Sequence, residues 1–207
     1  IVSSMVGADL DTRILDAAKR CVEQWGLAKV TIDDIATASG TSRATIYRLF
    51  PGGKDVLFEA LRVRELTDFF DALTLAVAAE DAPDGVEGFS ALIVRLITTA
   101  TAELRADQHL AIMLASEPGE TLGQLTVDGL PRIIRVATDY LVPMVRPYVE
   151  PADPALLIDL LVRLTISYFL APSDHVDLGD PESARAFIRP ALEAFLSTIP
   201  TRSVTAP

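Results

Sequence analysis

The chain has 207 residues, half of them hydrophobic, and its 18 Lys and Arg against 29 Asp and Glu give a formal net charge of −11. This length allows one large domain or two small ones around a substantial core, and the bulk negative charge repels nucleic acid except where basic residues gather. The single cysteine excludes an intrachain disulfide, and no basic segment with a following apolar run opens the sequence, so we expect a cytoplasmic protein without a signal peptide.

Helical periodicity begins near the N-terminus. Asp9 or Asp11 is predicted to cap a first helix, which ends at Gly26, the residue type that most often follows a last helical turn. Apolar residues recur at the 3.6-residue spacing of an amphipathic helix, which predicts one buried face. The residues on that face are Ile14, Ala17, Ala18, Cys21, Val22 and Trp25. The cysteine among them is therefore expected to be a buried hydrophobic residue and not a redox sensor.

A short second helix is predicted over residues 32–39. Thr31 and Asp34 have the spacing of a capping box, in which each side chain bonds the backbone N–H of the other residue. Gly40 follows this helix and can take the positive φ that a tight turn requires.

A third short helix is predicted over residues 43–50, with Ser42 as its N-cap. Pro51-Gly52-Gly53 ends it, and Lys54 begins a long fourth helix. Two short helices that are joined by a glycine turn and packed on a longer helix are typical of a helix-turn-helix.

The window 39–54 supports a DNA-binding role because it carries three basic residues and no acid. Ile46 and Phe50 are one turn apart and are predicted to face inward. The side chains left outside suit a major groove, since arginine pairs with guanine, alanine permits close approach and threonine can meet a thymine methyl. The predicted DNA-contacting residues are Thr31, Ser42, Arg43, Ala44, Thr45, Tyr47, Arg48 and Lys54.

The stretch ATASGTSRATIYRLFPGGKDVLFEAL resembles the signature of the tetracycline-repressor (TetR) family of bacterial regulators. The matching segments are TIDDIA at 31–36, SGTS at 39–42, TIYRLF at 45–50, and Lys54 with the apolar helix after it. The resemblance implies an all-α homodimer with an N-terminal helix-turn-helix domain and a C-terminal helical domain that binds a small molecule.

The resemblance also implies roles for single residues. Positions matching Arg43, Ala44, Thr45, Tyr47 and Arg48 face DNA in this family, and positions matching Thr31, Tyr47 and Lys54 hold its backbone. Leu49 stands where the family often has His or Tyr, and the Pro-Gly-Gly loop is one residue longer than usual, which can shift Lys54.

The rest of the chain is strongly acidic. Residues 61–207 carry eleven basic and twenty-one acidic residues, so DNA contact is expected only in the N-terminal part. We expect a DNA-binding domain over 1–55 and a ligand-binding and dimerisation domain over 56–207. Further helices are predicted over 86–106, 107–116, 121–128, 130–149, 153–171 and 181–198.

The most apolar of these predicted helices suit an oligomer interface. The run 155–172 is interrupted by Asp159 and Arg163 and is expected to be a buried or interface helix, because a membrane span needs about 20 largely uncharged residues. By the resemblance, the helices 130–149 and 153–171 match the pair that builds the dimer interface.

A ligand pocket is predicted on the middle helices, although core packing is the commoner role for any one of these residues. Because only 6% of the residues are aromatic, a lining of Leu, Ile, Val and Met favours a fatty acid, an acyl derivative or a similar lipophile. A cationic or aromatic drug-like compound is the alternative. The candidate lining residues are Phe70, Phe89, Leu92, Arg95, Leu96, His109, Leu110, Met113, Leu114, Ile134 and Met144, with Arg95 placed to hold a carboxylate.

An all-helical enzyme is the competing class of protein. The sequence has no G-x-S-x-G, phosphate loop or dinucleotide fingerprint. His109 and His175 lack a partner at metal-ligand spacing, and the carboxylates Glu117 and Glu120 flank a helix break. We therefore expect no catalysis, metal or cofactor, and a repressor that its ligand releases from a palindromic operator.

Overall fold

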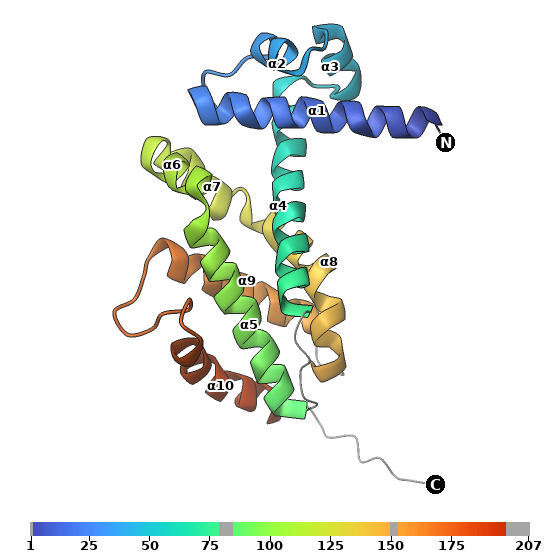
Figure 1. Ribbon diagram of the computed structural model, residues 1–207. Coiled ribbons are helices and arrows are strands. Elements are labelled where there is room, and N and C mark those ends of the chain that lie inside the picture. The colour runs from blue at the N-terminus through green and yellow to red at the C-terminus, as the bar shows by residue number, and fades with distance from the viewer. Residues whose placement is uncertain (1, 79–84, 150–152, 198–207) are drawn as a thin grey trace. The chain divides into compact units, whose positions relative to one another are not determined.

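The computed structural model describes residues 2–78, 85–149 and 153–197. Within these ranges the chain forms ten α-helices and no strand, which confirms the predicted all-α class (Figure 1). The helices gather into two compact units, Ile1–Asp68 and Phe69–Pro207, which divide inside one long helix. Compactness does not report where DNA binding ends, so the functional division at residue 55 stays a prediction.

The first unit contains α1 (Val2–Trp25), α2 (Ile32–Ser39), α3 (Arg43–Leu49) and the first part of α4 (Lys54–Ala78). Side chains from all four helices meet in one apolar core, because each helix has apolar residues on one face only. The fully buried members are Ile14, Ala17, Ala18, Ile35, Ile46 and Leu57. Ion pairs also join α1 to α4, with Arg64 Nη2 2.9 Å from Asp16 Oδ1 and Lys19 Nζ 3.3 Å from Glu65 Oε1.

Two predictions about the first helix are wrong. Neither Asp9 nor Asp11 caps it, because α1 extends back to Val2 and both acids lie inside the helix. Trp25 is 42% exposed, although it continues the apolar spacing of Cys21, which is buried. It is the last residue of α1, and Gly26 turns the chain directly after it with φ 80°.

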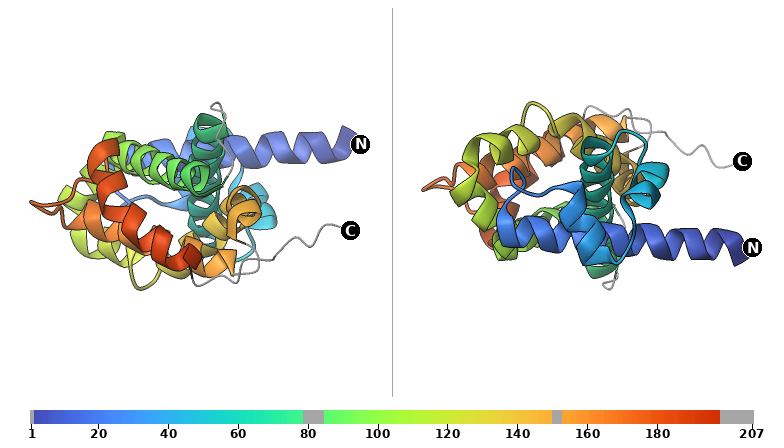
Figure 2. Two further views of the ribbon diagram at one scale, coloured as in Figure 1. Left: turned by 90° about the horizontal axis from the view of Figure 1, so that it is seen from below. Right: turned by 90° about the horizontal axis from the view of Figure 1, so that it is seen from above.

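The second unit consists of the rest of α4 and six further helices. These are α5 (Gly85–Ala106), α6 (Gln108–Ser116), α7 (Pro118–Leu125), α8 (Leu130–Val149), α9 (Pro154–Leu170) and α10 (Pro181–Ser197). The central helix α5 packs against α8, α9 and α10, and the pairing of α5 with α10 is visible in the left view of Figure 2. Arg189 on α10 also donates to Glu87 on α5 at 2.9 Å.

Two ring stacks join α8 to its neighbours. Phe70 stacks on Tyr140 with 5.9 Å between ring centroids, and Phe89 stacks on Tyr148 at 5.4 Å. Offset stacking of this kind adds to the hydrophobic gain of burial. The aromatic residues of this unit therefore serve its packing first.

One predicted helix is displaced by three residues. The expected helix over 121–128 begins at Pro118 and ends at Leu125. Proline fits the first helical position because its missing N–H needs no partner there, so the expected break at Glu117-Pro118-Gly119 narrows to Glu117.

The most apolar run of the sequence lies in α9. Leu157, Ile158 and Leu161 are buried, and Arg163 pairs with Asp159 one turn away at 2.9 Å. Among the described helices, none combines the length and hydropathy that crossing a membrane requires.

Candidate nucleic-acid interface and ligand groove

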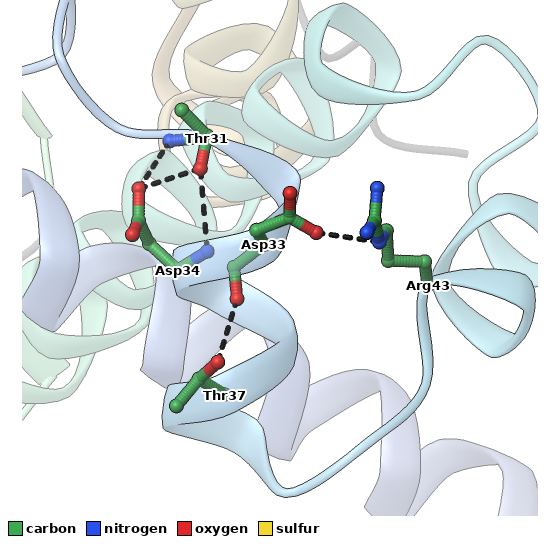
Figure 3. A network of polar contacts seen from close by, with 5 residues as sticks. All are labelled: Thr31, Asp33, Asp34, Thr37 and Arg43. Atoms are coloured by element: carbon green, nitrogen blue, oxygen red, sulfur yellow. Dashed lines mark hydrogen bonds and ion pairs between the residues drawn. The ribbon is translucent and has the colours of Figure 1, made fainter.

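The N-terminus of α2 is fixed by a reciprocal capping box, as the sequence predicts (Figure 3). Asp34 N–H donates to Thr31 Oγ1 at 3.3 Å, and Thr31 N–H donates to Asp34 Oδ2 at 2.9 Å. The Thr31 hydroxyl also donates to Asp34 Oδ2 at 2.6 Å. These hydrogen bonds, first from the side chain and then from the backbone of Thr31, lower the pKa of Asp34 because they stabilise its charged form.

The turn between α2 and α3 depends on Gly40. It adopts φ 65° and ψ 29°, the left-handed conformation that residues with a Cβ rarely take. Gly40 N–H donates to the Thr37 carbonyl at 3.3 Å, and Thr41 N–H donates to the Ala36 carbonyl at 3.0 Å. The last carbonyls of α2 are thus satisfied while the chain reverses into α3.

Ser42 caps α3, again as predicted. Thr45 N–H donates to Ser42 Oγ at 3.1 Å, and the two hydroxyls lie 3.0 Å apart. Ser42 and Thr45 are therefore used by the helix terminus itself, and only their remaining hydrogen-bonding capacity is open to a partner.

The two faces of α3 differ in burial. Ile46 is fully buried and the C-cap residue Phe50 is 7% exposed, so both point into the core as expected. Arg43, Ala44, Tyr47 and Arg48 are exposed, and Thr45 is half-buried. This helix therefore presents a short surface of two arginines, an alanine and a tyrosine, which we call the α3 face.

Tyr47 rests on the glycine loop that follows α3. Its ring lies so close to Gly53 that a Cβ there would come within 2.9 Å of Tyr47 Cε1, and Gly53 has φ 70°. A glycine at this position keeps the ring flat against the loop, with 53% of the tyrosine still exposed.

The three basic residues of the window differ in their surroundings. Arg43 Nε pairs with Asp33 Oδ1 of α2 at 2.5 Å (Figure 3). Lys54 Nζ donates to the Leu27 carbonyl at 3.0 Å and lies 5.6 Å from the centroid of the Phe58 ring. Arg48 is exposed and forms no ion pair with any residue that the structure describes.

Comparison with known proteins agrees with this geometry. Residues 14–61, which include α2, the turn and α3, match the profile of the bacterial regulatory proteins of the tetR family. An HTH-type transcriptional regulator, Mb2274c of Mycobacterium bovis (strain ATCC BAA-935 / AF2122/97), is 29% identical over 138 residues, which are 63% of this chain and 67% of that protein. The N-terminal helix-turn-helix of this chain therefore matches that of the TetR family.

Solved structures of TetR-family proteins share the fold. The TetR family repressor AlkX from Dietzia sp. strain DQ12-45-1b superposes with a TM-score of 0.62 at 19% identity, over 90% of this chain and 96% of that one. The R. erythropolis transcriptional repressor QsdR does so with a TM-score of 0.59 at 14% identity, over 92% and 95%. These two likenesses show that the chain shares its fold with TetR-family repressors.

The candidate ligand residues of this chain do not line a single site. Phe89, Leu92 and Leu96 are buried in α5, and Phe70 is buried beneath Tyr140. The half-buried candidates are Arg95 on α5, Leu110, Met113 and Leu114 on α6, and Ile134 and Met144 on α8. The side chain of His109 lies outside the described residues.

A groove of about 390 Å³ does lie between α4 and α8 within the second unit. Met144 is the only predicted ligand residue in its lining, which consists of Thr74, Ala78, Asp139, Tyr140 and Met144. Sequence reasoning missed the other four because only the relative rotation of α4 and α8 brings them together. Tyr140, one turn before Met144 on an apolar helix, was the available signal.

We predict that Gly40→Ala lowers the free energy of unfolding of the first unit by about 1 kcal/mol, the cost of a left-handed conformation for a residue with a Cβ. No atom lies within 4 Å of the position that the new Cβ would take, so the loss reports backbone strain and not a clash. Gly40→Asn is the control, because asparagine tolerates this conformation. Chemical denaturation followed by circular dichroism measures both variants, and equal stability of Gly40→Ala and the parent chain would contradict the prediction.

Proposed function

We propose that the chain is a ligand-responsive repressor, which binds a palindromic operator as a homodimer in the cytoplasm and is released by a lipophilic small molecule. The observation that carries the proposal is α3, a helix capped at its N-terminus by Ser42 that exposes Arg43 and Arg48 in a chain of net charge −11. An acidic protein keeps such a surface where a polyanion must be met locally.

The α3 face supplies the proposed base contacts. Arginine donates two parallel hydrogen bonds to guanine O6 and N7, and Ala44 leaves room for the helix to enter the groove. Thr31 and Tyr47 flank the face with hydroxyl groups suited to phosphate oxygens. Lys54 joins them if its ammonium exchanges the Leu27 carbonyl for a phosphate at the N-terminus of α4.

The proposed DNA contacts are tested by selecting duplexes from a random-sequence pool and then titrating the selected duplex with the protein. We expect Arg43→Ala to relax the preference at the contacted base pair, with a loss of about 1–3 kcal/mol against the preferred base. Lys54→Ala should weaken binding to every sequence and flatten the salt dependence by about one charge. Thermal unfolding of Lys54→Ala separates this effect from the lost bond to Leu27. A parent chain that enriches no sequence would refute operator binding.

A dimer is needed because one module of this size binds too small a site, and two recognition helices must meet half-sites about one helical turn apart. We place the interface at α9, where Leu156 is 63% and Leu160 52% exposed. Phe187 of α10 is also exposed and contacts Tyr168 of the same helix α9, at 5.5 Å between ring centroids. Among the described residues, α8 exposes no large apolar side chain, which argues against its expected share in the interface.

Native mass spectrometry tests the dimer directly. We expect the parent chain at twice its monomer mass and Leu160→Glu as a monomer, because two buried carboxylates would face each other across a two-fold axis. Val127→Glu, at a residue 82% exposed outside any helix, is the matched control and should remain dimeric. A monomeric parent chain would remove the mechanism, since a single recognition helix cannot read a palindrome.

The proposed effector is a fatty acid, an acyl derivative or a similar lipophile. The half-buried Met113, Leu114, Ile134 and Met144 support it, because flexible apolar side chains adapt to an aliphatic chain. The structural neighbour AlkX is described as implicated in biodegradation of n-alkanes, which is a property of that protein and supports an aliphatic effector here by analogy of fold.

The groove between α4 and α8 favours the second candidate effector, a cationic amphiphile. Its single charged residue is Asp139, which would repel a fatty-acid carboxylate and attract an amine. The ring of Tyr140 and the thioether of Met144 offer apolar contact beside that charge.

The same titration decides between the two effectors. We expect saturated C12–C18 fatty acids to weaken binding to the selected duplex about fivefold or more, the lower range of allosteric coupling. A ligand can change DNA affinity by no more than the difference between its own affinities for the two arrangements of the second unit. Asp139→Asn should leave a fatty-acid response intact and abolish a response to dodecylamine. If neither class of compound changes DNA affinity, the lipophilic effector is rejected and operator binding stands.

A further inference from the structure

The ion pair between Asp33 and Arg43 bridges the two helices of the helix-turn-helix. Asp33 is the second residue of α2 and Arg43 the first of α3, and Figure 3 shows their side chains reaching toward each other between the helices. The contact of this ion pair joins Asp33 Oδ1 to Nε of the guanidinium. The Asp33 and Arg43 side chains are 59% and 67% exposed, so the pair stands on the surface that carries the proposed base contacts.

Both partners stand on fixed backbone. Asp33 lies between Thr31 and Asp34, the two residues that form the capping box, and its carbonyl accepts a hydrogen bond from the Thr37 hydroxyl at 2.9 Å. Arg43 follows the N-cap Ser42. Because an exposed ion pair contributes little to stability, the consequence of this pair lies elsewhere, in the direction in which it holds the guanidinium.

We propose that Asp33 determines specificity by positioning Arg43. A carboxylate on Nε leaves the Nη1 and Nη2 edge of the guanidinium for a base, and guanine presents two acceptors, O6 and N7, that match such a pair of donors. The same negative charge opposes transfer of Arg43 to a phosphate, which carries no sequence information. Asp33 therefore lowers affinity for arbitrary DNA more than affinity for the operator.

This inference rests on the proposed operator binding, and its test uses the 207-residue chain with two probes. One probe is a random-sequence duplex, and the other is the duplex that the parent chain enriches from a random pool. The variant is Asp33→Asn, which keeps the shape and removes the charge. Asp55→Asn is the matched control, because Asp55 is the second residue of α4, is exposed, and forms no ion pair with the described residues.

We expect Asp33→Asn to bind the random duplex about threefold or more tightly, with a salt dependence steeper by about 0.9, the slope of one added phosphate contact. The ratio of selected to random affinity should fall about tenfold, within the discrimination that one bidentate arginine supplies. Asp55→Asn should leave this ratio unchanged. Asp33→Glu, which restores the carboxylate, should recover most of the ratio.

A second comparison assigns the effect to Arg43. In the Arg43→Ala background, Asp33→Asn should no longer change the preference at the contacted base pair. An unchanged ratio for Asp33→Asn, or an equal loss of preference in the Arg43→Ala background, would overturn the role of Asp33 while leaving operator binding intact. A parent chain that enriches no sequence would instead defeat operator binding and this inference with it.

Discussion

The first unit depends on the hydrogen-bonded caps at the ends of two very short helices. α2 has eight residues and α3 seven, and helices of this length are not stable in water by themselves. Three local devices hold them: the Thr31–Asp34 capping box, the left-handed Gly40, and the Ser42 cap. Each leaves few unpaired backbone groups at a terminus, and burial of Ile35 and Ile46 against α1 and α4 supplies the remaining stabilisation.

The first unit also limits the contacts that are open to its basic side chains. An acidic chain must concentrate its attraction for DNA in a few side chains, and it must also keep those side chains from binding any phosphate they meet. In the structure, Arg43 is held by Asp33 and Lys54 by the Leu27 carbonyl, while Arg48 extends from the exposed α3 face. Asp33 thus offsets the positive charge of Arg43, and this ion pair is the basis of the specificity that we propose.

The second unit has a different constraint, an excess of apolar side chains. Most of the excess is buried around α5, where Phe89 and Ile93 are almost completely enclosed. Part of the remainder is exposed, and it includes Leu156 and Leu160 on α9 and the apolar lining of the groove beside Tyr140. An exposed stripe and a groove are the features by which such a unit can associate with a second copy and accept a small molecule.

The sequence by itself determined the features that depend on neighbours along the chain. The caps at Thr31 and Ser42, the turn at Gly40, the bounds of α2 and the inward direction of Ile46 all follow from spacings of four residues or fewer. The motif around the turn also predicted the match of residues 14–61 to the TetR profile, because its spacing is local.

Only the tertiary structure decided which residues far apart in sequence meet. Asp33 on Arg43, the Leu27 carbonyl on Lys54, and the grouping of Thr74 with Asp139 depend on how helices are rotated against each other. Helical periodicity fixes which residues share a face but not the partner of that face, so the predicted ligand residues were divided between core and surface. The exposure of Trp25 was missed for the same reason, because helical spacing predicts its face of the helix but not what covers that face.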